Sequence, residues 1–417
     1  MPRIELLAWG EARALAEPIR FAVFVEEQRV PRDIELDDQD AGSLHAVAYE
    51  KGKAVATGRL LPDGHIGRMA VLKDRRRQGF GSAILTALME AAVKRGHASV
   101  ALSSQTHAVP FYRAHGFAAQ GGEYLEAGIP HLEMTLSLGR LILAQCARLA
   151  LEIAPQECMR GPWGEHCMPM HAVWPTLRLI GHVGGPAQDA GLFARAIALL
   201  DGPRPGVLIS GASDYAILEQ LLLAAGTARP LGDITVLDRC DTPLHLNRWY
   251  AARVDCAIET GRSDIIDYAP ARTFDAIFAH SFLEHLPRER WGSLAKRWQA
   301  LLRPGGVLAA VFRVRSEQEA AADVGTRRDA ADFLPFLEKT NATLPPRLQL
   351  PAQAVAERIA QHWRTRIISP VRSAGEVQDL LTAAGFKVEE AEQGAASVAA
   401  RPGLPTSKRI RLIARRV

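Results

Sequence analysis

Short runs rich in apolar residues and bounded by turn residues recur along the first part of the chain, a pattern typical of strands. Five short stretches have this pattern, at 46–49, 53–61, 66–71, 100–102 and 132–136. Apolar residues at helical spacing predict helices at about 79–95 and 110–115. The first three strands follow one another through short turns, which predicts an antiparallel meander. This block therefore reads as a mostly antiparallel sheet with helices.

Short apolar runs alternate with helical stretches in the second part of the chain, which is typical of a parallel sheet covered by helices on both faces. Seven strands are expected, at 207–210, 234–238, 257–259, 274–279, 307–313, 387–390 and 410–414. A mostly helical insertion at about 316–370 separates the fifth strand from the sixth. Such an insertion either covers an active site or forms a packing subdomain. The predicted fold class is α/β with two domains.

The length of 417 residues agrees with two or three domains. We predict a first domain over 1–138, a helical connecting segment over 139–199 and a second domain over 200–417. Hydrophobic residues make up 48% of the chain and charged residues 23%, proportions that exclude a disordered or coiled-coil protein. The odd number of cysteines, 5, does not describe a disulfide framework. With no signal-peptide core and no long apolar helix, we expect a cytoplasmic protein without a membrane partner.

A glycine- and arginine-containing loop, 73–82, joins the third strand to the first helix. Gly79 and Gly81 allow the backbone to approach a ligand closely, and the N–H groups at a helix N-terminus favour a diphosphate. The arginines supply positive charge. The alternative is an ordinary solvated turn.

Two motifs resemble the GNAT superfamily of acyl-CoA-dependent N-acyltransferases, Arg76-x-x-Gly79-x-Gly81 and Phe111-Tyr112-x-x-His115-Gly116-Phe117. Segments 23–31 and 128–134 look like the ElaA-type subgroup, so the resemblance covers about residues 1–138. It implies acetyl-CoA as the acyl donor, with Met69 to Val71 pairing with the pantetheine arm. The residues implied to hold the diphosphate are Arg76, Arg77, Gln78, Gly79, Gly81 and Ser82.

The same resemblance places Tyr112 near the thioester sulfur, as a proton donor to the departing thiolate. The amine that accepts the acetyl group must lose a proton, and four residues are candidates for the base: Glu126, His131, Glu26 and His45. An acidic cluster near the N-terminus consists of Glu26, Glu27, Glu35, Asp37, Asp38 and Asp40. We interpret it as the mouth that receives a cationic small-molecule amine, with Glu26 and Glu27 as substrate-binding residues.

The net charge of +4 is too small to indicate a nucleic-acid partner. The charged residues are nevertheless distributed unevenly along the chain. Residues 1–50 hold 5 basic and 11 acidic side chains, and residues 51–100 hold 10 basic and 3 acidic ones. This asymmetry supports a basic cofactor loop beside an acidic mouth.

The second block resembles class I S-adenosylmethionine-dependent methyltransferases over about 200–417. Asp238, at the tip of the second strand, is placed to accept both hydroxyls of a ribose. The resemblance implies that Gly211 lies beneath the methionine part, that Asp264 reaches the adenine amino group, and that His280 lies beside the sulfonium. A nicotinamide dehydrogenase is less well supported, because no Gly-x-Gly-x-x-Gly follows the first strand.

The first loop of this block departs from the usual methyltransferase pattern. Ile209, Ser213 and Tyr215 replace an acidic residue and two glycines, and the tyrosine is bulky where close approach is expected. The overall prediction is a bifunctional transferase that uses acetyl-CoA and S-adenosylmethionine. The alternative is an acetyltransferase whose second domain is a non-catalytic binding or scaffolding module. The oligomeric state is left open.

A segment between the blocks contains two cysteines and two histidines within a short distance: Cys158, His166, Cys167 and His171. These residue types are ligands for soft metals. Their spacing fits no standard zinc finger, so we predict no metal site and expect a loop that packs Trp163 and methionines over the methyltransferase mouth.

Overall fold

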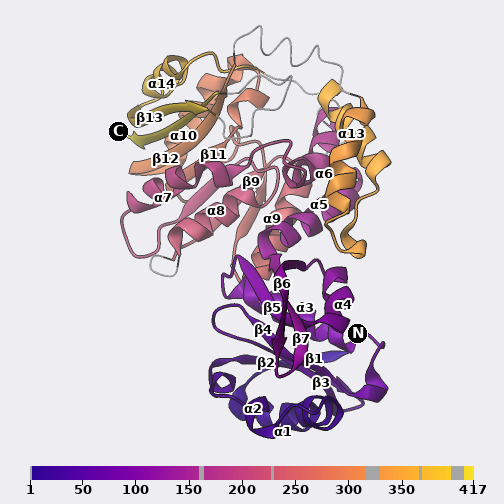
Figure 1. Cartoon of the computed structure of the whole chain (residues 1–417). Coiled ribbons are helices and arrows are strands. Elements are labelled where there is room, and N and C mark those ends of the chain that lie inside the picture. Colours follow the sequence, from indigo (N-terminus) through magenta and orange to yellow (C-terminus); the bar gives the residue numbers. More distant parts are fainter. Residues whose placement is uncertain (1, 159–163, 227–229, 316–328, 366–368, 396–407) are drawn as a thin grey trace. The chain divides into compact units, whose positions relative to one another are not determined.

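The computed structural model describes residues 2–158, 164–226, 230–315, 329–365, 369–395 and 408–417. These residues form two compact units (Figure 1). Unit 1 comprises Met1–Ile142 with two short later segments, Arg253–Asp255 and Thr343–Gln349. Unit 2 comprises Leu143–Ala252, Cys256–Ala342 and Leu350–Val417.

Unit 1 is built on two antiparallel sheets. The four-stranded sheet has the order β1 (Arg3–Ala8), β2 (Leu44–Glu50), β3 (Lys53–Leu60), β4 (Ile66–Val71). The three-stranded sheet has the order β5 (Ser99–Gln105), β7 (Ile129–Ser137), β6 (Ala118–Glu126). The predicted meander is confirmed, while β1 and β6 were not expected from the pattern.

The two sheets separate from each other between β4 and β5. These strands meet through one isolated bridge, His65 to Ala101, and belong to separate sheets beyond it. Within the described residues, the edge of β4 that faces away from β3 therefore has backbone groups without a strand partner from Gly67 to Val71. An extended ligand can pair with such an edge.

The helices of unit 1 are α1 (Trp9–Arg20), α2 (Arg32–Glu35), α3 (Phe80–Lys94) and α4 (Val109–Ala114). Helix α3 buries Ile84, Leu85 and Leu88 completely, each a burial of about 1.5–3 kcal/mol. Gly58 of β3 makes this close packing possible, because a Cβ there would lie 2.8 Å from Ile84 Cγ2. The packing fixes the start of α3 at the end of β4.

Unit 2 contains one seven-stranded sheet. Six strands lie where they were predicted, and the third, expected at 257–259, runs from Glu259 to Arg262 instead. Its order is β10 (Glu259–Arg262), β9 (Ile234–Asp238), β8 (Val207–Ser210), β11 (Phe274–His280), β12 (Leu302–Val314), β14 (Lys408–Arg416), β13 (Phe386–Ala395). The first five strands in this order are parallel, and β14 is antiparallel to both of its neighbours. The strand order reverses at β8, and the carboxyl ends of the strands at such a switch point form a ligand crevice.

Helices make up most of the rest of unit 2: α5 (Leu138–Glu157), α6 (Gly164–Leu179), α7 (Ala190–Ala198), α8 (Ala216–Ala225), α9 (Asp241–Arg253), α10 (Trp291–Leu301), α12 (Leu334–Asn341), α13 (Ala352–Thr365) and α14 (Ala374–Ala383). The boundary between the units falls within α5, so most of the segment expected to connect two domains packs as part of unit 2. The predicted insertion contains α12 and α13, although residues 316–328 and 366–368 lie outside the described part. Among the helices of the described residues, none has the length and apolar character needed to cross a membrane.

Candidate functional site

A cleft of about 1140 Å³ lies in unit 1, at the opening between the two sheets. It is large enough for a coenzyme together with an acceptor, since typical ligand pockets measure about 300–1,000 Å³. Seven of the eight residues predicted to hold the coenzyme line it: Met69, Val71, Arg76, Arg77, Gly79, Gly81 and Ser82. Gln78 is outside the lining, and its amide donates to the carbonyl oxygen of Asp74 at 2.9 Å.

The loop before α3 has the backbone shape of an anion cradle. Arg77 (φ 62°) and Gly79 (φ 88°) both adopt the left-handed conformation, which turns successive N–H groups toward one side. A Cβ built on Gly79 would meet no atom within 4 Å, so the space beside the first turn of α3 is open. The backbone of the loop therefore fits a diphosphate.

Tyr112 lines the same cleft and is almost fully buried, with 8% of its surface exposed. Its ring packs edge-on against Phe111 and Phe117, at centroid distances of 5.0 and 5.9 Å. Burial raises the pKa of Tyr112 to about 12. The phenol is therefore a weaker acid than the sequence analysis assumed, and its fitting role is to donate a hydrogen bond to a thiolate while keeping its proton.

Two of the four candidate bases, Glu126 and His131, line the cleft. The Nδ1 atom of His131 lies 2.8 Å from the carbonyl oxygen of Ile129, which requires a proton on Nδ1 and leaves Nε2 as an acceptor. Glu126 accepts a hydrogen bond from Ser103 Oγ at 3.0 Å. Ser103 also bonds to the hydroxyl of Tyr124, whose ring stacks on His131. Glu126, Ser103 and Tyr124 thus form a hydrogen-bonded group, and ring stacking places His131 beside it.

The other two candidate bases do not line the cleft. Glu26 is exposed at the surface. His45 is buried, and its Nε2 lies 3.0 Å from the carbonyl oxygen of Asp40. Burial also lowers the pKa of His45. This histidine belongs to the core rather than to the site.

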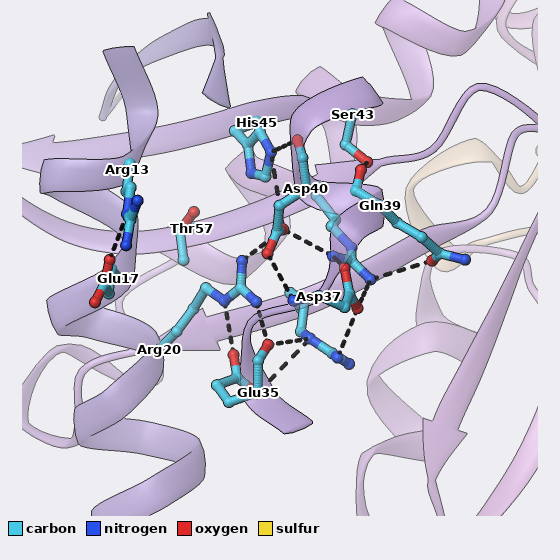
Figure 2. Close-up of polar contacts among 12 residues, drawn as sticks. Arg13, Glu17, Arg20, Glu35, Asp37, Gln39, Asp40, Ser43, His45 and Thr57 are labelled. Carbon is cyan, nitrogen blue, oxygen red and sulfur yellow. Dashed lines mark hydrogen bonds and ion pairs between the residues drawn. The ribbon is translucent and has the colours of Figure 1, made fainter. Parts of the chain in front are cut away.

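The acidic cluster expected to form an amine-binding mouth is largely an internal ionic network (Figure 2). Arg20 bonds to Glu35 at 2.6 Å and to Asp40 at 2.7 Å. Arg59 bonds to Asp40 at 2.7 Å and to Asp37 through both terminal nitrogens. Burial alone would raise the pKa of Asp40, but its hydrogen bonds to Arg20 and Arg59 hold that pKa below its usual value. Arginines from other elements neutralise Glu35, Asp37 and Asp40, and of these three carboxylates only Glu35 lines the cleft, so Asp37 and Asp40 do not form a substrate mouth.

Glu27 and Arg76, predicted to bind different substrates, bind each other at the edge of the cleft. Their two hydrogen bonds are 2.7 and 2.6 Å long. The pair lowers the pKa of Glu27 and raises that of Arg76. Arg76 also donates from Nε to the carbonyl oxygen of Val71 at 3.1 Å, which ties the loop to β4.

Sequence reasoning assigned no role to four polar residues of this cleft: Gln28, Arg68, Gln105 and His107. Gln105 donates to Gln28 at 2.9 Å, and His107 lies in the 3₁₀ turn before α4. Gln28 stands in the ElaA-like segment 23–31, but the other three belong to no motif, so nothing in the sequence indicated them.

A second pocket, of about 230 Å³, lies at the carboxyl ends of β8, β9 and β11 in unit 2. The four residues expected to contact S-adenosylmethionine all line it: Gly211, Asp238, Asp264 and His280. Both carboxylate oxygens of Asp238 accept backbone hydrogen bonds, from Ala212 at 3.0 Å and from Cys240 at 2.9 Å. The carboxylate is thereby held at the strand tip.

Gly211 adopts φ 79°, and a Cβ there would lie 2.4 Å from a ring carbon of Phe282. Only glycine fits this position. Tyr215, whose bulk was expected to crowd the loop, is not part of the pocket lining. It is buried, stacks on Tyr250 at 4.3 Å and lies beneath the guanidinium of Arg178.

Two of the predicted residues are bonded within the protein. Asp264 accepts a hydrogen bond from Arg290 at 3.0 Å. His280 Nε2 lies 2.9 Å from Asp189, a carboxylate that Arg409 and Arg411 also bind, at 2.9 and 2.6 Å. Burial lowers the pKa of His280, although Asp189 opposes this effect. The imidazole is neutral at neutral pH.

The same pocket contains a cluster that the sequence spacing did not predict as a metal site. The ligand atoms of Cys158, Cys167, His171 and Cys240 all lie within 4.8 Å of one another. The fourth member comes from the loop after β9, while the side chain of His166 lies outside the described part, as does Trp163.

Comparisons with known proteins found one family match and several similar proteins. The profile of a family described as "Acetyltransferase (GNAT) domain" matches residues 15–138. Uncharacterized N-acetyltransferase YjcF of Bacillus subtilis is 43% identical over 120 residues, which make up 28% of this chain and 86% of that protein. The crystal structure of Escherichia coli ElaA is 26% identical and covers 32% of this chain and 99% of its own, with a TM-score of 0.30. N-methyltransferase NodS from Bradyrhizobium japonicum, solved with S-adenosyl-L-homocysteine, is 15% identical and covers 66% of this chain and 98% of its own, with a TM-score of 0.35.

Proposed function

This chain belongs to the GNAT acetyltransferase family, and from that membership we propose that unit 1 transfers the acetyl group of acetyl-CoA to a small-molecule amine. One observation carries the proposal. A single cleft is lined by the anion-binding loop before α3, by the open edge of β4, and by Tyr112, Glu126 and His131. These are the parts that binding of the coenzyme and loss of an amine proton require.

Each residue has a task that follows from its surroundings. Acetyl-CoA supplies an activated thioester. The N-terminus of α3 and Arg77 bind its diphosphate, and the free edge of β4 orients the extended arm. His131 accepts the amine proton at Nε2, and Glu126, which lines the same cleft, is the alternative base. Tyr112 donates a hydrogen bond to the departing sulfur.

Steady-state kinetics with a panel of primary amines tests this proposal, using release of the coenzyme thiol as the readout. Tyr112→Phe should lower kcat by roughly 10–100-fold and leave the KM for acetyl-CoA within about twofold. Tyr49→Phe is the matched control, because Tyr49 bonds to Glu5 and does not line the cleft. Full kcat in the Tyr112 variant, or a wild-type protein that acetylates no amine of the panel, would contradict the proposal.

We propose a second activity for unit 2, the transfer of a methyl group from S-adenosylmethionine. The position of the pocket at the switch point of the sheet supports it, as does the fixed carboxylate of Asp238 at the tip of β9. Asp238 would bind the ribose, Asp264 the adenine amino group, and Gly211 would pass beneath the methionine part. His280, neutral at neutral pH, would accept a proton from the methyl acceptor where one must be removed.

The pocket volume of about 230 Å³ is small for such a ligand. Phe282 lies against Gly211, so we propose that this ring moves when the ligand binds. Calorimetric titration of the full-length protein with S-adenosylhomocysteine tests the site. Asp238→Ala should weaken binding by roughly 10–100-fold, since hydrogen bonds to a charged group contribute about 1.5–3 kcal/mol.

Asp241→Asn is the control for that titration, because Asp241 pairs with Arg262 and does not line the pocket. Equal affinities in the wild-type protein and the Asp238 variant would contradict the assignment of the ribose site. Absence of binding in the wild-type protein would support the alternative, an acetyltransferase that carries a non-catalytic module.

A further inference from the structure

We propose that Cys158, Cys167, His171 and Cys240 bind one zinc ion, in a site that fastens the loop after β9 to helices α5 and α6. The proposal concerns unit 2 alone and does not depend on methyl transfer. Three thiols and one imidazole form a ligand set that zinc uses in structural sites.

The distances between the side chains suit a tetrahedral ion. With Zn–S of about 2.3 Å and Zn–N of about 2.0–2.1 Å, a sulfur and a nitrogen ligand lie roughly 3.6 Å apart. The Nδ1 atom of His171 lies 3.5 Å from Cys158 Sγ and 3.1 Å from Cys167 Sγ. All four ligand atoms fall within 4.8 Å of one another, so small side-chain shifts suffice to surround one ion.

The backbone holds the ligands from three directions. Cys167 and His171 are four residues apart on α6 and so share one face of the helix. Cys158 follows the end of α5, and Cys240 precedes α9. Two consecutive helices and a loop far along the sequence thus deliver ligands to one point.

The environment of the cluster is that of a closed site. Cys158, His171 and Cys240 are 7%, 4% and 1% exposed. The hydroxyl of Thr242 lies 3.3 Å from Cys158 Sγ, where it can donate to a bound thiolate and orient it. With four protein ligands no coordination position is left for a substrate, so the role is structural rather than catalytic.

The site would determine the shape of the neighbouring pocket. The backbone N–H of Cys240 holds Asp238 at 2.9 Å, and Cys167, His171 and Cys240 line the pocket wall. A zinc ion on Cys240 would therefore fix the segment that positions the Asp238 carboxylate. Loss of the metal would loosen this segment without touching unit 1.

Elemental analysis of the full-length protein, purified under reducing conditions without chelator, tests the proposal. We expect about one zinc per chain in the wild-type protein and in Cys256→Ser, a control outside the cluster. Cys240→Ser and Cys167→Ser should each lose most of the metal. Zinc contents in these variants equal to that of the wild type would overturn the proposal.

A second measurement needs no variant and so does not depend on whether the variants fold. Wild-type protein stripped of metal and titrated with cobalt(II) should show thiolate-to-cobalt charge transfer and the strong visible bands of tetrahedral cobalt, saturating at one equivalent. Absence of these bands, a disulfide among the three cysteines in reducing buffer, or a different metal in the purified protein would overturn the zinc assignment.

Discussion

Each unit places a buried ionic network beside its ligand pocket, and the two networks differ in charge balance. In unit 1 three carboxylates meet three guanidiniums: Glu35, Asp37 and Asp40 with Arg20, Arg59 and Arg68. The formal charges of these six side chains therefore sum to zero. In unit 2 the single carboxylate of Asp189 is bonded to His280, Arg409 and Arg411. With the imidazole neutral, this network retains one positive charge.

The difference separates a structural role from a binding role. A balanced buried network has no net charge to offer a ligand, and its members mainly fix α1, β3 and β4 against the segment that contains Glu35, Asp37 and Asp40. Both networks have members in their pocket linings, Glu35 and Arg68 in unit 1 and His280 and Arg409 in unit 2. Only the surplus charge of the unit 2 network favours an anionic group. Acidic residues in a sequence therefore do not identify a cationic substrate until their partners are known.

The largest effect is expected from breaking the balanced network. Asp40→Ala removes the shared acceptor of Arg20 and Arg59 and leaves two buried guanidiniums undercompensated, so unit 1 should lose about 3–5 kcal/mol of stability. Asp38→Ala, at an exposed position, should change stability by less than about 0.5 kcal/mol. Denaturant unfolding measures both, and similar losses in the two variants would contradict a structural role of the network.

The surplus charge of unit 2 can be tested with two arginines that share one carboxylate. Arg409→Met removes the arginine that lines the pocket and should weaken S-adenosylhomocysteine binding by roughly 10-fold or more. Arg411→Met also loses a bond to Asp189, but Arg411 does not line the pocket, and affinity should stay within about threefold. Calorimetry that finds equal losses would show that the charge serves the fold alone.

The pH dependence of unit 2 stability follows from Asp189. Burial would raise its pKa, but the hydrogen bond to His280 and the positive charges of Arg409 and Arg411 hold the pKa below its usual value. A depressed carboxyl pKa stabilises the fold above about pH 4, and this contribution is lost as pH falls through the folded-state pKa. Between pH 6 and pH 3 the Tm of the wild-type protein should therefore fall by about 2–4 °C more than that of Asp189→Asn. Parallel Tm curves would disprove the linkage.

The smallest effect is expected at the pair of Glu27 and Arg76. Its side chains are about one-third exposed, so the pair contributes at most about 1 kcal/mol. Glu27→Gln frees Arg76 for the coenzyme and should tighten acetyl-CoA binding by up to about fivefold. Glu26→Gln should leave it unchanged. If Glu27 also receives the amine, its variant will raise the KM for the amine as well, and unchanged amine kinetics would restrict Glu27 to its pairing with Arg76.

Much of the fold could be predicted because hydrophobic periodicity marks buried strands. Strands β8, β9 and β11 of unit 2 are apolar runs, and four-residue β8 is buried throughout. The strand β6 escaped prediction because every residue in it is exposed, so it has no apolar face to reveal it. β1 was missed as well, and it is partly exposed along its length.

The coenzyme loop was predictable because its residues are contiguous and glycine is needed at fixed places. The ionic network was not, because Arg20, Arg59 and Arg68 are spread over three elements that only the folded chain brings together. Cys240 escaped for the same reason: it lies far along the sequence from Cys158, Cys167 and His171. The spacing of residues within one segment cannot reveal a set of metal ligands when one of them lies far away in the sequence.

We propose that one chain carries two separate transferase sites. Calorimetric titration of the full-length protein with acetyl-CoA, followed by S-adenosylmethionine in the same cell, tests this proposal most directly. We expect one equivalent of each ligand to bind, and we expect saturation with acetyl-CoA to leave the affinity for S-adenosylmethionine unchanged. Absence of acetyl-CoA binding, or competition between the two ligands for one site, would contradict it.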